Sequence, residues 1–276
     1  MGYRRALISP AVCTAPKNSQ SPRALLELAA PDAGTGRPYD SVLPGTGSNL
    51  QNRIQAVEQR LAAAVQKAGR RRSDIQLVAV TKKFSSAVIR EAYQAGFREF
   101  GENYVQEFAA KRPEMGDLPH ARYHLIGHLQ SNKARIAVTL FDVIQTVDSP
   151  KLLKRLNDVA GEQGKQLQVL LEIKLSDEAS KTGARPEDIP AVLQSAARCE
   201  NVRVSGLMTM PPWSEDAELS RPYFHSLAGL ARQYSLPELS MGMSNDFEVA
   251  IEEGATIVRV GTALFGARPK PAATGP

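Results

Sequence analysis

The sequence predicts a single (β/α)8 barrel of the TIM-barrel kind, preceded by one extra helix. Short apolar segments of strand length alternate with amphipathic segments of helix length across residues 49–266. Several strand segments are apolar on both faces, as at 75–80 and 168–175, which is typical of parallel strands buried beneath helices. Eight such strands can close into a barrel, and α/β barrels commonly have about 250 residues. The 276 residues of the chain are enough for one.

A doubly wound open sheet is the alternative architecture for the same alternation of strands and helices. Such folds often carry a glycine-rich loop directly after the first strand, where it holds a dinucleotide. The residues that follow Val80 are Thr-Lys-Lys-Phe-Ser-Ser, without a glycine. This favours the barrel.

The extra helix is predicted at residues 49–69. Apolar residues recur there every three or four positions, and Gly69 ends the pattern. We interpret the three arginines at 70–72 as a solvated helix end, because basic side chains favour the negative end of the helix dipole. The apolar positions are Leu50, Ile54, Val57, Leu61 and Val65.

Strands and helices then alternate along the chain. The strand segments are continuous apolar runs, whereas the helix segments space their apolar residues three or four positions apart. The predicted strands are 75–80, 99–101, 123–126, 141–147, 168–175, 203–208, 238–243 and 256–260. The predicted helices fill each gap and include 85–95, 104–111, 150–163, 186–197, 216–234 and 246–253.

The two ends of the chain differ in texture from the barrel segment. Residues 1–48 are rich in Pro, Gly, Ser and Ala, and we interpret them as a disordered extension or as the product of a start codon placed too far upstream. Residues 1–26 contain basic but no acidic side chains, as transit peptides do, yet they show no clear amphipathic helix. We therefore expect a cytoplasmic protein, with organelle targeting as the lesser alternative. Residues 267–276 are predicted to be a short tail.

Composition excludes several classes of protein. The chain is 42% hydrophobic and 23% charged, as soluble globular domains are, and no apolar run approaches the ~20 residues of a membrane span. Cys13 and Cys199 form no spaced pair that would indicate a disulfide framework or a zinc site. The net charge of +5 is spread along the chain, so we expect neither a nucleic-acid nor a membrane partner.

Three histidines recur every four residues, at His120, His124 and His128. On a helix they would align as metal ligands. The residues between them are typical of a strand, in which positions four apart lie about 13 Å apart and cannot share one ion. We therefore predict no metal site.

In such a barrel the functional residues lie at the C-terminal ends of the strands. The first strand ends in Thr81-Lys82-Lys83. A lysine in that place is partly desolvated, which lowers its pKa and favours the neutral amine that forms a Schiff base. The two lysines point to opposite faces of the strand, and alternation alone does not say which one faces the barrel mouth. A side chain that simply extends to water is the alternative.

A phosphate-shaped pair of sites follows the last two strands. Ser244 ends the seventh strand just before a predicted helix, so a hydroxyl and free backbone N–H groups meet the positive end of a helix dipole. After the eighth strand, Gly261 and Thr262 offer a bare backbone and another hydroxyl, where barrel enzymes often bind phosphate. Helix capping is the plain alternative. Arg259 favours a ligand site, because a guanidinium inside an apolar strand needs a buried partner.

These residues lie in segments that resemble the pyridoxal-phosphate homeostasis protein family. The resemblance covers about residues 50–266 and many separate motifs in order. The matching segments are Leu-Val-Ala-Val-Thr-Lys ending at Lys82, Phe-Gly-Glu-Asn-Tyr-Val-Gln-Glu at 100–107, His-Leu-Ile-Gly-His-Leu-Gln-Ser-Asn-Lys at 124–133, Ser-Asp-Glu-Ala-Ser-Lys-Thr-Gly at 176–183, Gly-Leu-Met-Thr-Met at 206–210, Met-Ser-Asn-Asp-Phe at 243–247 and Arg-Val-Gly-Thr-Ala-Leu-Phe-Gly at 259–266.

The resemblance implies a fold-type-III barrel of the alanine racemase N-terminal kind, with pyridoxal 5′-phosphate (PLP) bound to Lys82 as a Schiff base. It places the phosphate on Ser244, Gly261 and Thr262. It also places the ring nitrogen near Arg259. By the same resemblance Asn103 and Met208 line the cofactor, and Lys181 matches a lysine linked to cofactor transfer or to a second binding mode.

The chain departs from the family pattern at three places. Many members carry a second lysine two positions after the Schiff-base lysine, where this chain has Phe84, and Lys83 lies between the two. His128 stands where we expect proline. The N-terminal extension has no recognisable counterpart.

The favoured function is a PLP carrier that buffers the cofactor or delivers it to PLP-requiring apo-enzymes without significant catalysis. The alternative is an amino-acid racemase of the alanine racemase type, and a third is a structural or interaction barrel with a vestigial site. Alanine racemases add a C-terminal β-domain, for which we expect no material after the eighth strand, and we accordingly expect a monomer. Arg259 would leave the ring nitrogen unprotonated, which weakens the ring as an electron sink.

Overall fold

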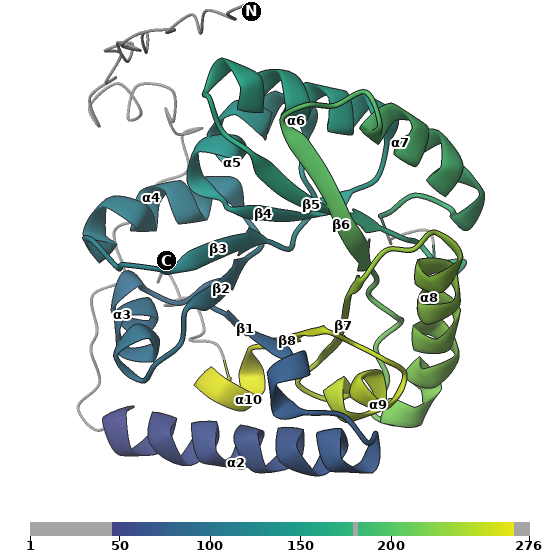
Figure 1. Cartoon of the computed structure of the whole chain (residues 1–276). Helices are drawn as coiled ribbons and strands as arrows, with labels where there is room; N and C mark the ends of the chain where they lie inside the picture. Colours follow the sequence, from purple (N-terminus) through teal and green to yellow (C-terminus); the bar gives the residue numbers. More distant parts are fainter. Residues whose placement is uncertain (1–45, 179–181, 268–276) are drawn as a thin grey trace, which may run out of the picture. The chain divides into compact units, whose positions relative to one another are not determined.

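The computed structural model describes residues 46–178 and 182–267. Within this part of the chain eight strands form a closed barrel in the order β1-β2-β3-β4-β5-β6-β7-β8, and each strand pairs in parallel with its neighbours. Helices surround the barrel, and α2 lies beside α9 and α10 (Figure 1). The predicted barrel and its extra helix are confirmed. The extra helix begins at Thr46, so the interpretation of residues 46–48 as part of the extension is wrong. The interpretations of residues 1–45, of Lys181 and of residues 268–276 lie outside the described residues.

Each strand has one face toward the barrel interior and one toward the surrounding helices, and most of the strand side chains are buried. The strands are β1 Gln76–Val80, β2 Glu99–Glu102, β3 Arg122–Leu125, β4 Val143–Val147, β5 Leu167–Glu172, β6 Val202–Met208, β7 Glu238–Met243 and β8 Ile257–Val260. The α-helices are α2 Thr46–Lys67, α3 Ser86–Gln94, α4 Val105–Met115, α5 Ala134–Leu140, α6 Pro150–Glu162, α7 Ile189–Ala196, α8 Arg221–Gln233, α9 Phe247–Glu252 and α10 Thr262–Phe265.

Prolines explain why two predicted helices begin late. Pro190 and Pro222 lie in the first turns of α7 and α8, where a missing N–H costs no intrahelical hydrogen bond. The residues before them form the short 3₁₀ segments Pro186–Asp188 and Ala217–Ser220. The regular helices therefore start after the predicted positions 186 and 216.

Strand β5 ends three residues before its predicted end at position 175. Ile173 forms an isolated bridge with Ala184. The Lys174 N–H donates to the Ala184 carbonyl at 2.8 Å, and the Ala184 N–H donates to the Glu172 carbonyl at 2.8 Å. The chain thus leaves the barrel wall after Glu172, and the carboxylate of Glu172, not Lys174, stands at the end of the strand.

The interpretation of Arg70 as part of a solvated helix end is wrong. Helix α2 ends at Lys67, and the Arg70 guanidinium donates to the carbonyls of Ile251 and Ala255 at 3.1 and 2.6 Å. Arg70 therefore ties the end of α2 to the end of α9. Arg71 and Arg72 are exposed, as the interpretation requires.

Two cores hold the barrel. The outer core lies between strands and helices, and its aromatic centre joins Phe108 to Tyr123 and to Phe141 with ring centroids 4.9 Å apart in each pair. Stacking of large rings at such distances stabilises beyond the burial of area alone. The inner core fills the barrel and consists of Val78, Val143, Leu170, Met208 and Ile257.

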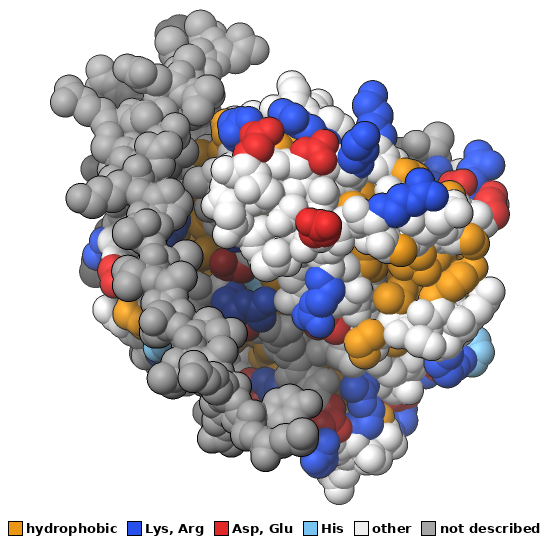
Figure 2. All heavy atoms as spheres, turned by 45° about the horizontal axis from the view of Figure 1, so that its top comes forward, with side chains coloured by type: hydrophobic (Ala, Val, Ile, Leu, Met, Phe, Trp, Pro, Cys, Tyr) orange, Lys and Arg blue, Asp and Glu red, His pale blue; other side chains and the backbone are white. Residues whose placement is uncertain are grey.

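None of the helices in residues 46–178 and 182–267 is long and apolar enough to cross a membrane. On the face shown in Figure 2, basic and acidic side chains are intermingled, unlike the continuous basic stripe that follows a nucleic-acid backbone.

Candidate functional site

Lys82 and Lys83, at the end of β1, lie in different surroundings. The Thr81 hydroxyl donates to Glu102 Oε1 at 2.8 Å on the side of the strand where α4 packs. Because side chains alternate along an extended chain, Lys82 lies on the opposite side, which faces the barrel interior. Lys82 is partly buried and Lys83 is exposed. Lys83 also has a positive φ of 63°, so the chain turns away from the barrel there.

A buried ion pair behind β1 holds this turn in place. The Lys111 ammonium of α4 contacts Glu102 Oε1 at 3.0 Å and Glu107 Oε1 at 2.6 Å. It also donates to the Thr81 carbonyl at 3.1 Å, and the Lys83 N–H donates to Glu107 at 2.5 Å. Burial raises the pKa of Glu102, which Lys111 and Thr81 partly oppose. The backbone on both sides of Lys82 is therefore anchored by α4.

The hydroxyl of Ser244 joins the ends of β7 and β8. Ser244 Oγ accepts hydrogen bonds from the N–H groups of Gly261 and Ala263, each at 3.2 Å. These amides lie at the start of α10, which the sequence did not predict. The expected convergence of Ser244 with Gly261 is thus present, and Thr262, which is exposed, begins the helix. A hydroxyl beside the amides of a first helical turn is suited to an anion.

The helix that faces this hydroxyl is α10, whereas the sequence pointed to the next helix after Ser244, α9. Asp246 stands at the start of α9 and is 6% exposed. Its carboxylate accepts hydrogen bonds from the Met243 N–H at 2.7 Å and from the Ser220 hydroxyl at 2.8 Å. A carboxylate at that helix end would repel an anion, which favours α10 over α9 as the helix that faces a phosphate.

Arg259 points into the barrel from β8 and is 3% exposed. Its Nη1 donates to Ser240 Oγ at 2.6 Å and its Nη2 donates to the Thr209 carbonyl at 2.9 Å. Burial lowers the pKa of Arg259 to about 10, opposed by the charges of Asp246 and Glu172. The guanidinium therefore remains protonated at neutral pH, and the buried partner expected from the sequence is a pair of neutral oxygens.

Two polar atoms at the barrel mouth are buried without a hydrogen-bond partner: Asn103 Oδ1, after β2, and Glu172 Oε2, at the end of β5. Glu172 Oε1 accepts from the Thr182 hydroxyl at 2.9 Å, and burial raises the pKa of Glu172. Leaving such groups unpaired costs free energy. Gly127 fixes the backbone beside Asn103, because a Cβ there would lie 2.2 Å from the Asn103 carbonyl oxygen.

The predicted residues occupy one arc of the barrel. Lys82 follows β1, whose neighbours are β2 and β8, so Asn103 and Gly261 follow adjacent strands. Ser244 follows β7, the next strand around the barrel. Met208 ends β6 and lies in the inner core. Phe84, which stands in place of an expected lysine, packs on Phe265 of α10 with ring centroids 5.5 Å apart.

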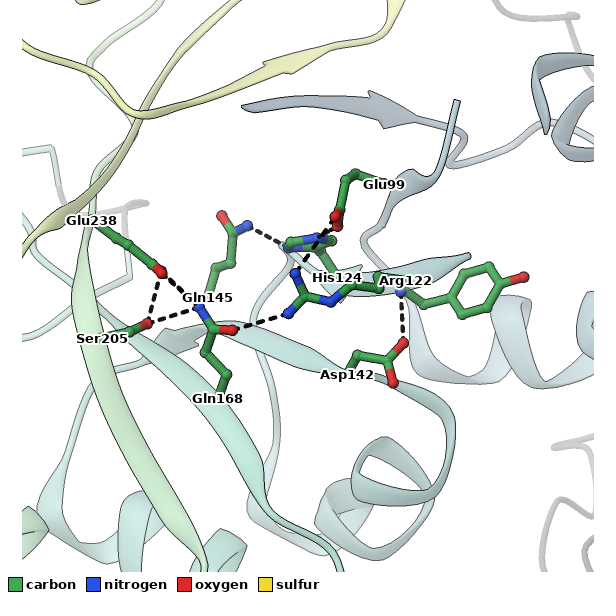
Figure 3. Close-up of polar contacts among 9 residues, drawn as sticks. Glu99, Arg122, His124, Asp142, Gln145, Gln168, Ser205 and Glu238 are labelled. Atoms are coloured by element: carbon green, nitrogen blue, oxygen red, sulfur yellow. Dashed lines mark hydrogen bonds and ion pairs between the residues drawn. The ribbon is translucent and has the colours of Figure 1, made fainter. Parts of the chain in front are cut away.

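Of the three histidines only His124 lies in a strand, β3, whereas His120 stands in the turn before it with a φ of 63° and His128 follows it. The prediction of one strand through all three is therefore wrong. Residues 46–178 and 182–267 hold no cluster of potential metal ligands. His124 of β3 is buried and lies between Glu99 and Gln145 (Figure 3). His128 is exposed, 3.9 Å from Asp148. Sequence reasoning missed the polar residues that the barrel interior contains beneath the mouth. The sequence signal that could have revealed them is a polar residue at an inward-facing position of an otherwise apolar strand, as at Gln145 and Ser240.

Comparisons with known proteins identify the family of this chain. Residues 53–269 match the model of the family described as alanine racemase, N-terminal domain. A pyridoxal phosphate homeostasis protein of Pseudomonas aeruginosa is 42% identical over 223 residues, which are 80% of this chain and 96% of that protein.

Two solved structures show the same fold. PipY of Synechococcus elongatus, solved with PLP bound, is 45% identical with a TM-score of 0.66, over 75% of this chain and 99% of that one. An alanine racemase of Clostridium difficile is 14% identical with a TM-score of 0.60, over 81% of this chain and 58% of that one, and it shares the fold alone. This chain belongs to the pyridoxal phosphate homeostasis proteins, within the family of the alanine racemase N-terminal domain.

Proposed function

We propose that this chain binds PLP as a Schiff base on Lys82 and holds the cofactor for PLP-requiring apo-enzymes, without turning over a substrate of its own. One observation carries the proposal. An inward-facing lysine at the end of β1 stands on the same arc of the barrel mouth as the hydroxyl of Ser244, which is hydrogen-bonded to the amides of Gly261 and Ala263.

The residues at the mouth fit PLP. Ser244, Gly261 and Thr262 would hold its phosphate through hydroxyl and backbone N–H donors. Arg259 would face the ring nitrogen as a donor that keeps its proton. The buried Oδ1 of Asn103, which lacks a partner, is suited to a donor on a ligand. When bound, PLP supplies an aldehyde that forms a reversible C=N bond with a lysine amine.

Two arguments favour a carrier over a racemase. The relatives at about 40% identity are matched over nearly their whole length and are named for PLP homeostasis. The racemase at 14% identity shares the fold alone. Arg259 would hold the ring nitrogen without giving up a proton, and an unprotonated ring is a weaker electron sink for carbanion chemistry. We further propose a cytoplasmic monomer whose function lies in residues 49–266.

A transfer assay tests the carrier role. PLP-loaded protein, freed of excess cofactor, is expected to restore activity to a PLP-requiring apo-enzyme while leaving D- and L-alanine unchanged. The Lys82→Ala variant treated in the same way is the control for carried-over free PLP. Racemisation of alanine at an enzymatic rate, on the order of 1 s⁻¹ or faster, would favour the racemase alternative.

Replacement of Ser244 by alanine is expected to weaken PLP binding by about 1–2 kcal/mol, the scale of one lost hydrogen bond to a charged group. Equilibrium titration of PLP, followed by absorbance, measures the change. Ser226→Ala is the matched control, because the Ser226 hydroxyl is exposed on α8 and donates to the Pro222 carbonyl. Equal affinities of the two variants would remove Ser244 from the site.

A further inference from the structure

A continuous line of hydrogen bonds crosses the barrel interior from Arg259 to Glu99. Arg259 Nη1 lies 2.6 Å from Ser240 Oγ, which lies 2.6 Å from Gln145 Oε1. Gln145 Nε2 lies 2.9 Å from His124 Nδ1, and His124 Nε2 lies 2.6 Å from Glu99 Oε2. Figure 3 shows the His124 ring between Gln145 and Glu99. The line thus connects side chains of five strands, β8, β7, β4, β3 and β2.

The two ends of the line determine the direction of every hydrogen bond in it. A guanidinium can only donate and an ionised carboxylate can only accept. Burial would raise the pKa of Glu99, but the contacts of His124 and Arg122 outweigh it and hold the pKa below its usual range. Glu99 is therefore ionised at neutral pH.

With both ends set, only one arrangement satisfies each group between them. Ser240 accepts from Arg259 and donates to the Gln145 oxygen. The Gln145 amide nitrogen donates to His124 Nδ1, and His124 Nε2–H donates to Glu99. The opposite orientation of the Gln145 amide would leave the Ser240 hydroxyl without an acceptor in this line.

The orientation of the Arg259 guanidinium depends on this line, because Arg259 is held by neutral oxygens, those of Ser240 and Thr209. Ser240 is fully buried, so its hydroxyl has no water to replace a lost partner. A hydroxyl that already donates to Gln145 must present its lone pairs to Arg259, and the Thr209 carbonyl fixes the second nitrogen. We infer that Ser240, Gln145, His124 and Glu99 are positioning residues that orient Arg259 and thereby determine how it faces the cofactor ring. This inference rests on the proposed function.

A second polar line provides a matched control, and it meets the first line only where Arg122 contacts Glu99 at 3.5 Å. Arg122 donates to the Gln168 oxygen at 2.9 Å, and the Gln168 amide donates to Ser205 and to Glu238 (Figure 3). Ser205 is 4% exposed and also donates to Glu238 at 2.8 Å. Ser205→Ala therefore removes a buried serine hydroxyl from the same barrel without touching the contacts of Arg259.

The full chain is compared with its Ser240→Ala and Ser205→Ala variants by two measurements. Nitrogen-15 NMR of arginine-labelled protein without cofactor follows the guanidinium of Arg259, and PLP titration gives the affinity and the absorbance maximum of the bound cofactor. Ser240→Ala is expected to merge the separate Nη signals of Arg259, shift the absorbance maximum and weaken PLP binding about tenfold, the scale of one hydrogen bond to a charged group. Ser205→Ala is expected to leave the Arg259 signals and the absorbance maximum unchanged.

Glu99→Gln tests the far end of the line. It also shows whether the line orients Arg259 if Ser240→Ala does not fold. Its amide oxygen can still accept from His124, whereas the charge that faces His124 and Arg122 is removed. A change in the Arg259 signals and in the absorbance maximum supports the inference. Wild-type values of both overturn it. If the wild-type protein takes up no PLP, the proposed function fails, whereas the NMR comparison still decides whether the line orients Arg259.

Discussion

Replacement of Lys82 by alanine is expected to abolish the Schiff-base absorbance of PLP added to the protein. Lys82 is the lysine that lies on the inner side of the β1 end, while Thr81 is engaged on the outer side with Glu102. Without its amine the cofactor aldehyde has no partner at that position. Weak binding through Ser244, Gly261 and Thr262 is expected to remain, since these residues follow β7 and β8 and do not depend on Lys82. Absorbance titration of the purified variant measures the result.

Lys83→Ala is the matched control for this experiment. Lys83 is adjacent in sequence and exposed, and the contact found for it with Glu107 is made by its backbone N–H, which alanine retains. The variant is therefore expected to bind PLP with the wild-type spectrum. If Lys83→Ala lost the absorbance and Lys82→Ala kept it, the assignment of the two lysines would be reversed.

The largest expected loss of stability comes from Lys111→Met. The side chains of Lys111 and Glu102 are 10% and 0% exposed, so the substitution leaves a buried carboxylate that has lost its cation. Removing one partner of such a pair costs about 3–5 kcal/mol. Denaturant unfolding of the protein without cofactor measures the free energy of unfolding. PLP binding is expected to weaken as well, because Lys111 also holds the Thr81 carbonyl just before Lys82.

Two further variants show whether the loss comes from the unpaired charge. Arg72→Ala breaks a pair with Glu58 in which the side chains are 41% and 44% exposed, and such exposed pairs contribute about 0–1 kcal/mol. Adding Glu102→Leu to Lys111→Met removes the stranded carboxylate and is expected to recover part of the stability. A loss for Lys111→Met no larger than that for Arg72→Ala would show that the buried pair does not hold the end of β1.

The fold could be predicted because its signals are local and repeated. Apolar runs such as residues 75–80 and the helical spacing before Gly69 each point to one element, and eight strand–helix units leave few topologies. Boundaries failed where the deciding contact is distant in sequence. Strand β5 ends early because Ala184 pairs with Ile173 and Lys174, and the four residues of α10 are too few to show a period.

The positions of the candidate site residues at the strand ends could be predicted from the sequence, whereas most of their hydrogen-bond partners could not. Lys82, Ser244 and Gly261 stand where strand ends predict them, and Ser244 does meet the Gly261 amide. The contact of Ser244 with the start of α10 was not predictable, because Ala263 lies 19 positions from Ser244 in the sequence. The hydrogen-bond line behind Arg259 joins residues up to 160 positions apart, Glu99 to Arg259. No spacing rule reveals it, although inward-facing polar residues in apolar strands mark its members.

The assignment of PLP to Lys82 is tested most directly by borohydride reduction followed by peptide mass spectrometry. The full chain is loaded with PLP, reduced, digested and searched for a reduced phosphopyridoxyl group on lysine. We expect this modification on Lys82, with Lys83 unmodified. A modification found instead on Lys83 or on Lys111, or spread evenly over exposed lysines, would contradict it.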